Sequence, residues 1–200
     1  MKPSARPIDS SPGTFVFPAD GRHFCIPRIG AETHVFAKGQ RLDLDALLGP
    51  DAARFHGGSL IISRLCPVDY HRFHFPCAGT PGPARLVNGA LFSVSPIALA
   101  RNLGYLWQNK REITLLESPR GPVAIVEIGA TCVGTIRQTF QPGMPVAIGQ
   151  EKGYFAFDGS CVISVFPEGS IRFAGDLLHA SSQGLECYAR MGEPMGSQPE

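Results

Sequence analysis

The peptide bond between Gly159 and Ser160 has the residue types that a self-cleaving chain needs. It lies within a largely apolar, strand-like run that spans residues 151–167. Glycine offers an unhindered carbonyl and wide backbone freedom, and flanking strands could hold the bond strained while the adjacent hydroxyl attacks it. The alternative is a tight Gly-Ser turn, which is the ordinary role of such a dipeptide.

Two further blocks supply bases and an acid for such an attack. Residues 69–80 contain His71 and His74 among aromatic neighbours, and residues 17–21 contain Asp20, which lies two residues after a Pro and directly before a Gly. Imidazole titrates near neutrality and therefore suits proton transfer. Taken singly, a histidine beside aromatic residues is more often structural, and an Asp before Gly more often forms a turn.

Together the three blocks resemble the phosphatidylserine decarboxylase family. Its members carry P-x-D-G near the front, Y-H-R-x-H-x-P in the middle and G-S near the end, and the order and approximate spacing agree here. With this match, catalytic roles for the two histidines and Asp20 are favoured. Further family landmarks extend the resemblance over residues 15–196: Phe36-Ala37-Lys38-Gly39, Leu47-Leu48-Gly49, Asn109-Lys110-Arg111 and residues 126–136.

The resemblance implies a proenzyme that makes its own cofactor. The Ser160 hydroxyl would attack the Gly159 carbonyl to give an ester, elimination would leave a dehydroalanine, and hydrolysis would release ammonia and leave a pyruvoyl group. The two products would be residues 1–159, the β chain, and residues 160–200, the α chain. A decarboxylase that acts on an amino acid needs an electron sink, and the pyruvoyl group derived from Ser160 would supply it.

The roles of the side chains follow from this chemistry. A serine hydroxyl is a weak nucleophile at neutral pH unless a base removes its proton. By the logic of a Ser-His-Asp triad, we expect His74, oriented by Asp20, to be that base. We expect His71 to transfer a proton to the carbanion that decarboxylation leaves. Arg72 is either a partner for an anionic substrate group or a structural ion-pair residue, and we assign it no role.

The implied reaction converts phosphatidylserine to phosphatidylethanolamine and carbon dioxide. A lipid substrate requires an apolar docking surface, and residues 90–108 are either that surface or an ordinary core helix. Lys110 and Cys161 depart from the family pattern, so a soluble amino acid or a modified serine is the alternative substrate. A β-rich binding module that does not cut itself is the alternative from another class of protein.

Composition favours one mainly β domain. A chain of 200 residues with 44% hydrophobic content can bury one sizeable core, and its 23 Gly and 18 Pro break helices and favour short strands joined by turns. We expect a single compact domain of short antiparallel strands, barrel-like or sandwich-like, with two or three short helices. A net charge of +1 without long runs of like charge argues against nucleic acid as a partner.

The sequence predicts a cytoplasmic protein. Residues 1–12 lack an apolar core of signal-peptide length, and no apolar stretch reaches the ~20 residues that span a bilayer. A lipid substrate would add peripheral contact with the cytoplasmic membrane face. Six cysteines without a Cys-x-x-Cys are typical of reduced thiols. A zinc site of Cys66, His71, His74 and Cys77 is a weaker alternative because the spacing is not that of a usual finger, so we expect no metal.

Short elements must position these groups. Residues 1–13 read as a polar tail, and residues 14–200 as one decarboxylase domain. Strand-like patterns lie on both sides of the Gly159-Ser160 bond, so we expect both arms to belong to sheets. Since residues three apart face opposite sides of a strand, His71 and His74 share a pocket only if the backbone bends between them. The cleaved chains would remain together as an α/β heterodimer, which could dimerise further.

Other patterns predict elements around the site. Residues 43–49 combine a capping acid, apolar spacing and a terminal Gly, and residues 96–108 have apolar residues at helical spacing, so both predict helices. Residues 59–66 and 73–75 read as consecutive strands, and residues 113–140 as a meander of three strands.

Overall fold

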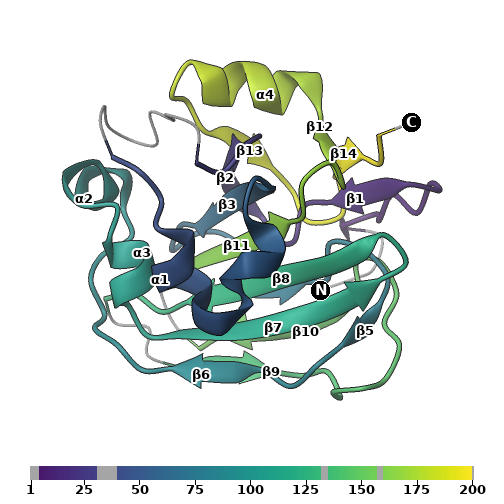
Figure 1. Cartoon of the computed structure of the whole chain (residues 1–200), viewed down its shortest axis with the longest axis horizontal. Coiled ribbons are helices and arrows are strands. Elements are labelled where there is room, and N and C mark those ends of the chain that lie inside the picture. Colours follow the sequence, from purple (N-terminus) through teal and green to yellow (C-terminus); the bar gives the residue numbers. More distant parts are fainter. Residues whose placement is uncertain (1–4, 31–39, 132–134, 157–159, 200) are drawn as a thin grey trace.

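The computed structural model describes residues 5–30, 40–131, 135–156 and 160–199. Antiparallel strands form the body of the molecule, and helices cover its periphery (Figure 1). The expected mainly β, single compact domain is confirmed. The described residues contain four α-helices and one 3-10 helix, more than the two or three helices expected.

One sheet of eight strands runs through the molecule. Every pairing in it is antiparallel, and β11 lies between β3 and β8 in its middle. Across the sheet the strands are β13 (Cys187–Ala189), β2 (Gly21–Ile26), β3 (Ser59–Leu65), β11 (Ser160–Phe166), β8 (Gly121–Ile128), β7 (Arg111–Ser118) and β5 (Thr80–Pro81), with β6 (Arg85–Val87) also paired to β7.

Two sheets of three strands complete the β structure. The first contains the two ends of the described chain, in the order β1 (Thr14–Val16), β14 (Pro194–Ser197) and β12 (Arg172–Phe173). The second contains the histidine block, in the order β4 (Arg72–His74), β10 (Glu151–Phe155) and β9 (Ile136–Gln138). The predicted meander is therefore wrong at its third strand, because β9 pairs with β10 in this small sheet instead of continuing the large one.

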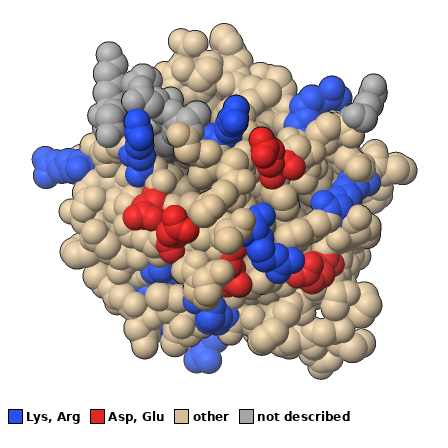
Figure 2. Space-filling view, in the orientation of Figure 1, with Lys and Arg blue, Asp and Glu red and all other residues tan. Residues whose placement is uncertain are grey.

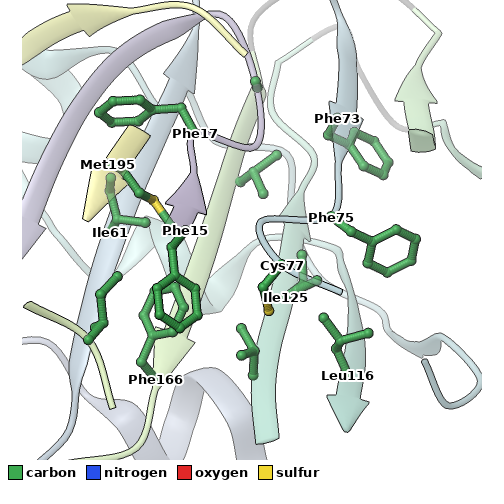
Figure 3. Packing of buried hydrophobic residues seen from close by; sticks show 14 of the residues in the cluster. Phe15, Phe17, Ile61, Phe73, Phe75, Cys77, Leu116, Ile125, Phe166 and Met195 are labelled. Carbon is green, nitrogen blue, oxygen red and sulfur yellow. The ribbon is translucent and has the colours of Figure 1, made fainter. Parts of the chain in front are cut away.

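The large sheet has a hydrophobic core on each face, because side chains alternate along its strands. The inter-sheet core lies between the large sheet and the two small ones, where Phe15 of β1 and Phe166 of β11 meet with ring centroids 5.3 Å apart (Figure 3). Other members of the inter-sheet core are Ile61, Phe73, Phe75, Ile125 and Val162. The helix-side core includes Phe24, Leu47, Phe55, Ile62, Leu99, Leu106, Val126 and Ile163.

Short helices close the helix-side core. The predicted helix at residues 43–49 is α1 (Leu44–Leu48), and the Asp43 carboxylate caps it by accepting from the Ala46 N–H at 2.8 Å. The 3-10 helix η2 (Gly49–Phe55) follows directly. The predicted helix at residues 96–108 is two helices, α2 (Pro96–Arg101) and α3 (Tyr105–Gln108).

The break between α2 and α3 has a local cause. Asn102 adopts an extended conformation, and its side-chain oxygen accepts from the Gly104 N–H at 2.9 Å. Asparagine competes for backbone groups in this way, which ends helices. Helix α4 (Gly175–Ser182) was not predicted, and it lies on the inter-sheet side, where Ser181 accepts a hydrogen bond from the Cys25 N–H of β2 at 2.9 Å.

Residues 5–13 lack a strand but are attached to the domain, unlike the loose tail that the sequence predicts. The Asp9 N–H donates to the Gly192 carbonyl at 3.0 Å, and the Gln198 N–H donates to the Gly13 carbonyl at 2.9 Å. Acidic and basic side chains are interspersed on the face that Figure 2 shows, in keeping with the small net charge. Within the described residues, no helix has both the length and the apolar character to cross a membrane.

Candidate active site

Ser160 is the first residue of β11, which lies in the large sheet, whereas the strand before it in the sequence, β10, lies in a small sheet. The neighbour of Ser160 in the large sheet is Leu65, the last residue of β3. The preceding strand β10 belongs to the small sheet, where it pairs with β4. Both arms of the Gly159-Ser160 bond are therefore strands, as predicted, but they lie in different sheets. Gly159 itself lies outside the described residues.

The side chain of Ser160 faces the inter-sheet core. It lies on the same side of β11 as Val162 and Phe166, which both belong to that core. Ser160 is fully buried, and its Oγ has no hydrogen-bond partner among the described residues. An unpaired buried hydroxyl costs free energy and calls for an explanation. Ser164, two residues beyond Val162, has an equally unpaired hydroxyl, so the feature singles out Ser160 only together with the bond that precedes it.

His74 ends β4 as a buried, neutral base. Its Nδ1 lies 2.9 Å from the Gly149 carbonyl oxygen, which can only accept, so Nδ1 carries the hydrogen and Nε2 presents its lone pair. That Nε2 is buried and has no partner among the described residues. Desolvation is the largest influence on this imidazole and lowers its pKa below the ordinary value of 6.5.

His71 lies in the connection between β3 and β4. Its Nδ1 is 2.8 Å from the Asp69 carbonyl oxygen, and its Nε2 is buried without a partner in the described part of the chain. The His71 carbonyl accepts from the Phe155 N–H at 3.0 Å, so this backbone lies beside the end of β10. His71 thus lies in the β3–β4 connection beside the end of β10, and Ser160 follows the connection from β10 to β11.

The pairing of β4 with β10 contains a β-bulge, which lies on β10 and not in the backbone between the two histidines. His74 pairs with Glu151 and Phe73 pairs with Gly153, so Lys152 is an extra residue on β10. His71 precedes β4 and is therefore free of the alternation that strand geometry would impose.

The expected orientation of His74 by Asp20 is not what the structure has. Asp20 is buried, and its carboxylate accepts from the Met191 N–H at 2.9 Å and from the Arg6 guanidinium, whose Nε lies 2.9 Å from Oδ1. These bonds help to lower the pKa of the Asp20 carboxyl despite its burial. No hydrogen bond joins Asp20 to His74 among the described residues, and the Gly149 carbonyl fixes the imidazole instead.

Arg72 has a structural partner. It donates to Glu151 at 2.6 Å across the β4–β10 pair and lies over the Tyr154 ring, 5.0 Å from its centroid. The candidate zinc ligands are not gathered either, since no group of three or more metal-binding side chains occurs within the described residues. Cys77 is buried in the inter-sheet core, while the Cys66 sulfur accepts a hydrogen bond from the Arg22 guanidinium at 2.9 Å.

Cys161, which follows Ser160, faces the opposite side of the sheet. It is fully buried in the helix-side core, and desolvation raises the pKa of its thiol to about 12. A thiol with that pKa remains protonated near neutrality and is a poor nucleophile. The departure from the family pattern at this position therefore leaves Ser160 without a competing nucleophile.

A buried ion pair, which the sequence analysis missed, ties the two sheets together near the site. Lys152 of β10 and Glu127 of β8 are both fully buried, and the Lys152 Nζ lies 3.0 Å from Glu127 Oε2. Gln138 of β9 bridges the two, accepting from Lys152 at 2.8 Å and donating to Glu127 at 2.9 Å. Burial raises the pKa of Glu127 and lowers that of Lys152, and each charge opposes the shift of the other.

The local sequence pattern does not indicate the structural roles of Lys152 and Arg6. Adjacent Glu151 and Lys152 read as charged surface positions, and only the bulge turns Lys152 inward. Arg6 lies in a stretch without strand or helix periodicity, so its contact with Asp20 has no local signal.

Comparison with known proteins identifies relatives of the whole chain. Residues 1–197 match the family described as phosphatidylserine decarboxylase. The phosphatidylserine decarboxylase proenzyme of Chlamydia muridarum is 48% identical over 99% of this chain and 67% of the relative. The proenzyme of Chlamydia trachomatis serovar L2 is 45% identical over the same shares, and that of Clostridium perfringens is 40% identical over 99% of this chain and 68% of its own. The chain thus spans about two thirds of the length of these relatives.

Proposed function

The chain belongs to the phosphatidylserine decarboxylase family, and we propose that it cuts itself between Gly159 and Ser160 and then converts phosphatidylserine to phosphatidylethanolamine and carbon dioxide. The relatives are named as proenzymes for this activity. The observation that carries the proposal is that three side-chain atoms of the candidate site, Ser160 Oγ, His71 Nε2 and His74 Nε2, are buried without a hydrogen-bond partner among the described residues.

Self-cleavage is an attack by a residue on its own chain. The Ser160 Oγ forms a bond to the Gly159 carbonyl carbon, the amide bond to the Ser160 nitrogen breaks, and an ester results. His74 Nε2 takes the hydroxyl proton, because this atom is the free acceptor of a neutral imidazole, and returns it to the departing Ser160 nitrogen. Loss of the Ser160 α-proton then expels residues 1–159 as a carboxylate and leaves dehydroalanine. Water converts this residue to the pyruvoyl group and releases ammonia.

The surroundings of residue 160 fit a pyruvoyl cofactor. Residue 160 is held at the end of a central strand by its pairing with Leu65, and it is shielded from bulk water. The group would supply the electron sink that decarboxylation of an amine-bearing carbon requires. The chain contributes proton transfer, and His71 Nε2 is our candidate to deliver a proton to the substrate carbon.

The two fragments would remain one protein. The α chain, residues 160–200, would contain β11, which pairs with β3 on one side and with β8 on the other. These partners belong to the β chain, residues 1–159, so the heterodimer is held by a continuous sheet. We retain the cytoplasm as the location, with peripheral contact at the cytoplasmic membrane face. The scattered cysteines favour a reducing compartment.

Mass spectrometry of the purified chain and of two variants tests the proposal. The chain should give one fragment ending at residue 159 and one of residues 160–200 with a pyruvoyl terminus. Ser160→Ala should remain full-length and inactive on phosphatidylserine. Ser164→Ala is the matched control, since Ser164 lies on the same strand with an equally unpaired hydroxyl, and it should still be cut.

Two outcomes would overturn the proposal. One is fully active protein whose residue 160 carries an ordinary amino group, or that has no new terminus. The other is a processed enzyme that releases carbon dioxide from free serine but not from phosphatidylserine in micelles, which would favour a soluble substrate.

A further inference from the structure

A cleft of about 480 Å³ opens where β11 begins. Leu65, which pairs with Ser160, lines it, and so do Ala130 and Thr131, which follow the end of β8. Leu65 also belongs to the inter-sheet core, so the cleft reaches the end of the strand as well as the helix-side face. Its other lining residues are Arg22, Arg64, Cys66, Pro67 and residues 93–96.

Within the part of the chain that the structure describes, one of the two arginines that line the cleft has no carboxylate partner. Arg64 is buried and forms a two-pronged ion pair with Glu186, with both N–O distances at 2.7 Å. Arg22 is exposed, and its one side-chain hydrogen bond in the described part of the chain goes to the Cys66 thiol at 2.9 Å. Among the described residues, the lining of the cleft includes neither Asp nor Glu. The cleft therefore favours an anion, and a guanidinium suits a phosphate.

Exposed apolar side chains neighbour lining residues of the same cleft in the sequence. Val68 is 91% exposed and follows the lining residue Pro67, and Ile97 is 74% exposed and follows Pro96. Leu91 and Phe92, which precede Ser93, are 39% and 42% exposed. Contiguous exposed apolar patches on a protein surface mark contacts with other proteins, ligands or membranes. We call Val68, Leu91, Phe92 and Ile97 the apolar rim.

We propose that this cleft is the headgroup site for a glycerophospholipid at a bilayer surface, with Arg22 bound to the phosphodiester and the apolar rim in contact with lipid. The proposal rests on the proposed function. A cation inside the cleft, an apolar border and the adjoining residue 160 match the three parts of such a substrate, namely the phosphate, the diacylglycerol and the reacting amino acid.

The geometry also fixes the direction of approach. Arg22 shares the helix-side face of β2 with Phe24 and Ile26, whereas the Ser160 hydroxyl faces the inter-sheet core. The headgroup thus reaches residue 160 past Leu65, around the strand end, while Arg22 holds the phosphate on the helix side. Arg72 is not needed for the anion, because Glu151 already pairs with it.

Binding to the uncut chain tests the phosphate contact without any catalysis. Titration of the Ser160→Ala chain with glycerophosphoserine should show saturable binding that weakens at least about tenfold in Ser160→Ala/Arg22→Gln, the loss expected for a charged hydrogen bond. Arg54→Gln in the same background is the control, since Arg54 is an exposed arginine on η2 paired with Glu117. Inorganic phosphate should bind more weakly than the diester, and equal binding of both would reduce the cleft to a general anion site and overturn the proposal.

Kinetics of the processed enzyme test the same contact in turnover. With short-chain, micellar phosphatidylserine, Arg22→Gln should raise KM by more than it lowers kcat, and Arg22→Lys should restore part of the loss. With anionic vesicles, Ile97→Asp should reduce binding severalfold, whereas Met144→Asp should not. Met144 is 56% exposed and lies near β5, away from the apolar rim.

The two proposals fail in different ways. If the parent chain yields no pyruvoyl fragment, the proposed function is wrong whatever the cleft binds. If the parent chain is cut and active, but Arg22→Gln has the KM and the glycerophosphoserine affinity of the parent, only the headgroup site is wrong. Equal loss of vesicle binding in Ile97→Asp and Met144→Asp would likewise contradict the role of the apolar rim.

Discussion

At the scale of single residues, backbone carbonyls decide which imidazole nitrogen is available. Gly149 and Asp69 each supply a carbonyl oxygen to an Nδ1, at 2.9 Å for His74 and 2.8 Å for His71. Both rings therefore present Nε2 as the atom that can take or hold a proton. A neutral carbonyl stabilises an imidazolium less than a carboxylate would, which suits a base that must release its proton again.

Substitution of the two histidines should affect two different reactions, self-cleavage for His74 and decarboxylation for His71. His74→Ala should slow self-cleavage by about a hundredfold or more, the usual contribution of a positioned base. His71→Ala should still be cut but should lose decarboxylation to a similar degree. Because the His74 pKa is below 6.5, the rate of self-cleavage should be level at neutral pH and should fall on acidification below that value. Gel analysis of fragments against time and pH measures both, and normal cutting in His74→Ala with intact chain in His71→Ala would exchange the roles.

The residues of the candidate site could be proposed from the sequence, but their hydrogen-bond partners could not. Asp20, His71, His74 and Ser160 stand in recognisable blocks. The partner of Asp20 is Arg6, from a segment with no pattern, and the partner of His74 is a backbone carbonyl, which every residue possesses. Contacts of this kind depend on how the chain folds back, and local residue patterns do not record it.

At the scale of elements, the change of sheet between β10 and β11 is the feature that the sequence leaves undetermined. Apolar alternation predicts strands on both sides of the bond correctly, because periodicity is local. The choice of partner for each strand is a non-local property, so neither the two sheets nor the place of β9 follows from the pattern. The break in the predicted helix at residues 96–108 was missed for a different reason. The apolar spacing continues through it, although the hydrogen bond between the Asn102 side chain and the Gly104 N–H ends the helix locally.

The ion pair between Lys152 and Glu127 should matter more when one partner is lost than when both are replaced. Lys152→Met leaves a buried carboxyl alone and should cost about 3–5 kcal/mol of unfolding free energy. Adding Glu127→Gln should recover part of that loss. Since burial raises the Glu127 pKa above 4.5, the deficit of Lys152→Met should grow as pH rises from that value. Urea unfolding in the uncut Ser160→Ala background measures the cycle, and additive losses would mean that the pair is not coupled.

At the scale of the whole molecule, stability should decline in mild acid. His23 is fully buried beside the Ser63 hydroxyl, and desolvation lowers its pKa from 6.5 to about 4. The unfolded chain binds this proton more readily than the folded chain, so the stabilisation is complete above pH 6.5 and is lost as pH falls toward 4. The loss approaches about 3 kcal/mol. Unfolding of Ser160→Ala at several pH values should show this slope, and an equal slope in Ser160→Ala/His23→Gln would rule out His23 as its source.

The place of β11 in the middle of the large sheet has a consequence for the lifetime of the enzyme. Before cutting, one chain finds its fold by itself. After the proposed cut, the central strand would belong to a separate molecule of 41 residues, and every return from the denatured state would require a collision between two species. Renaturation would therefore become concentration-dependent once the chain has matured, so a heat-denatured enzyme would recover more slowly at low concentration than its uncut precursor.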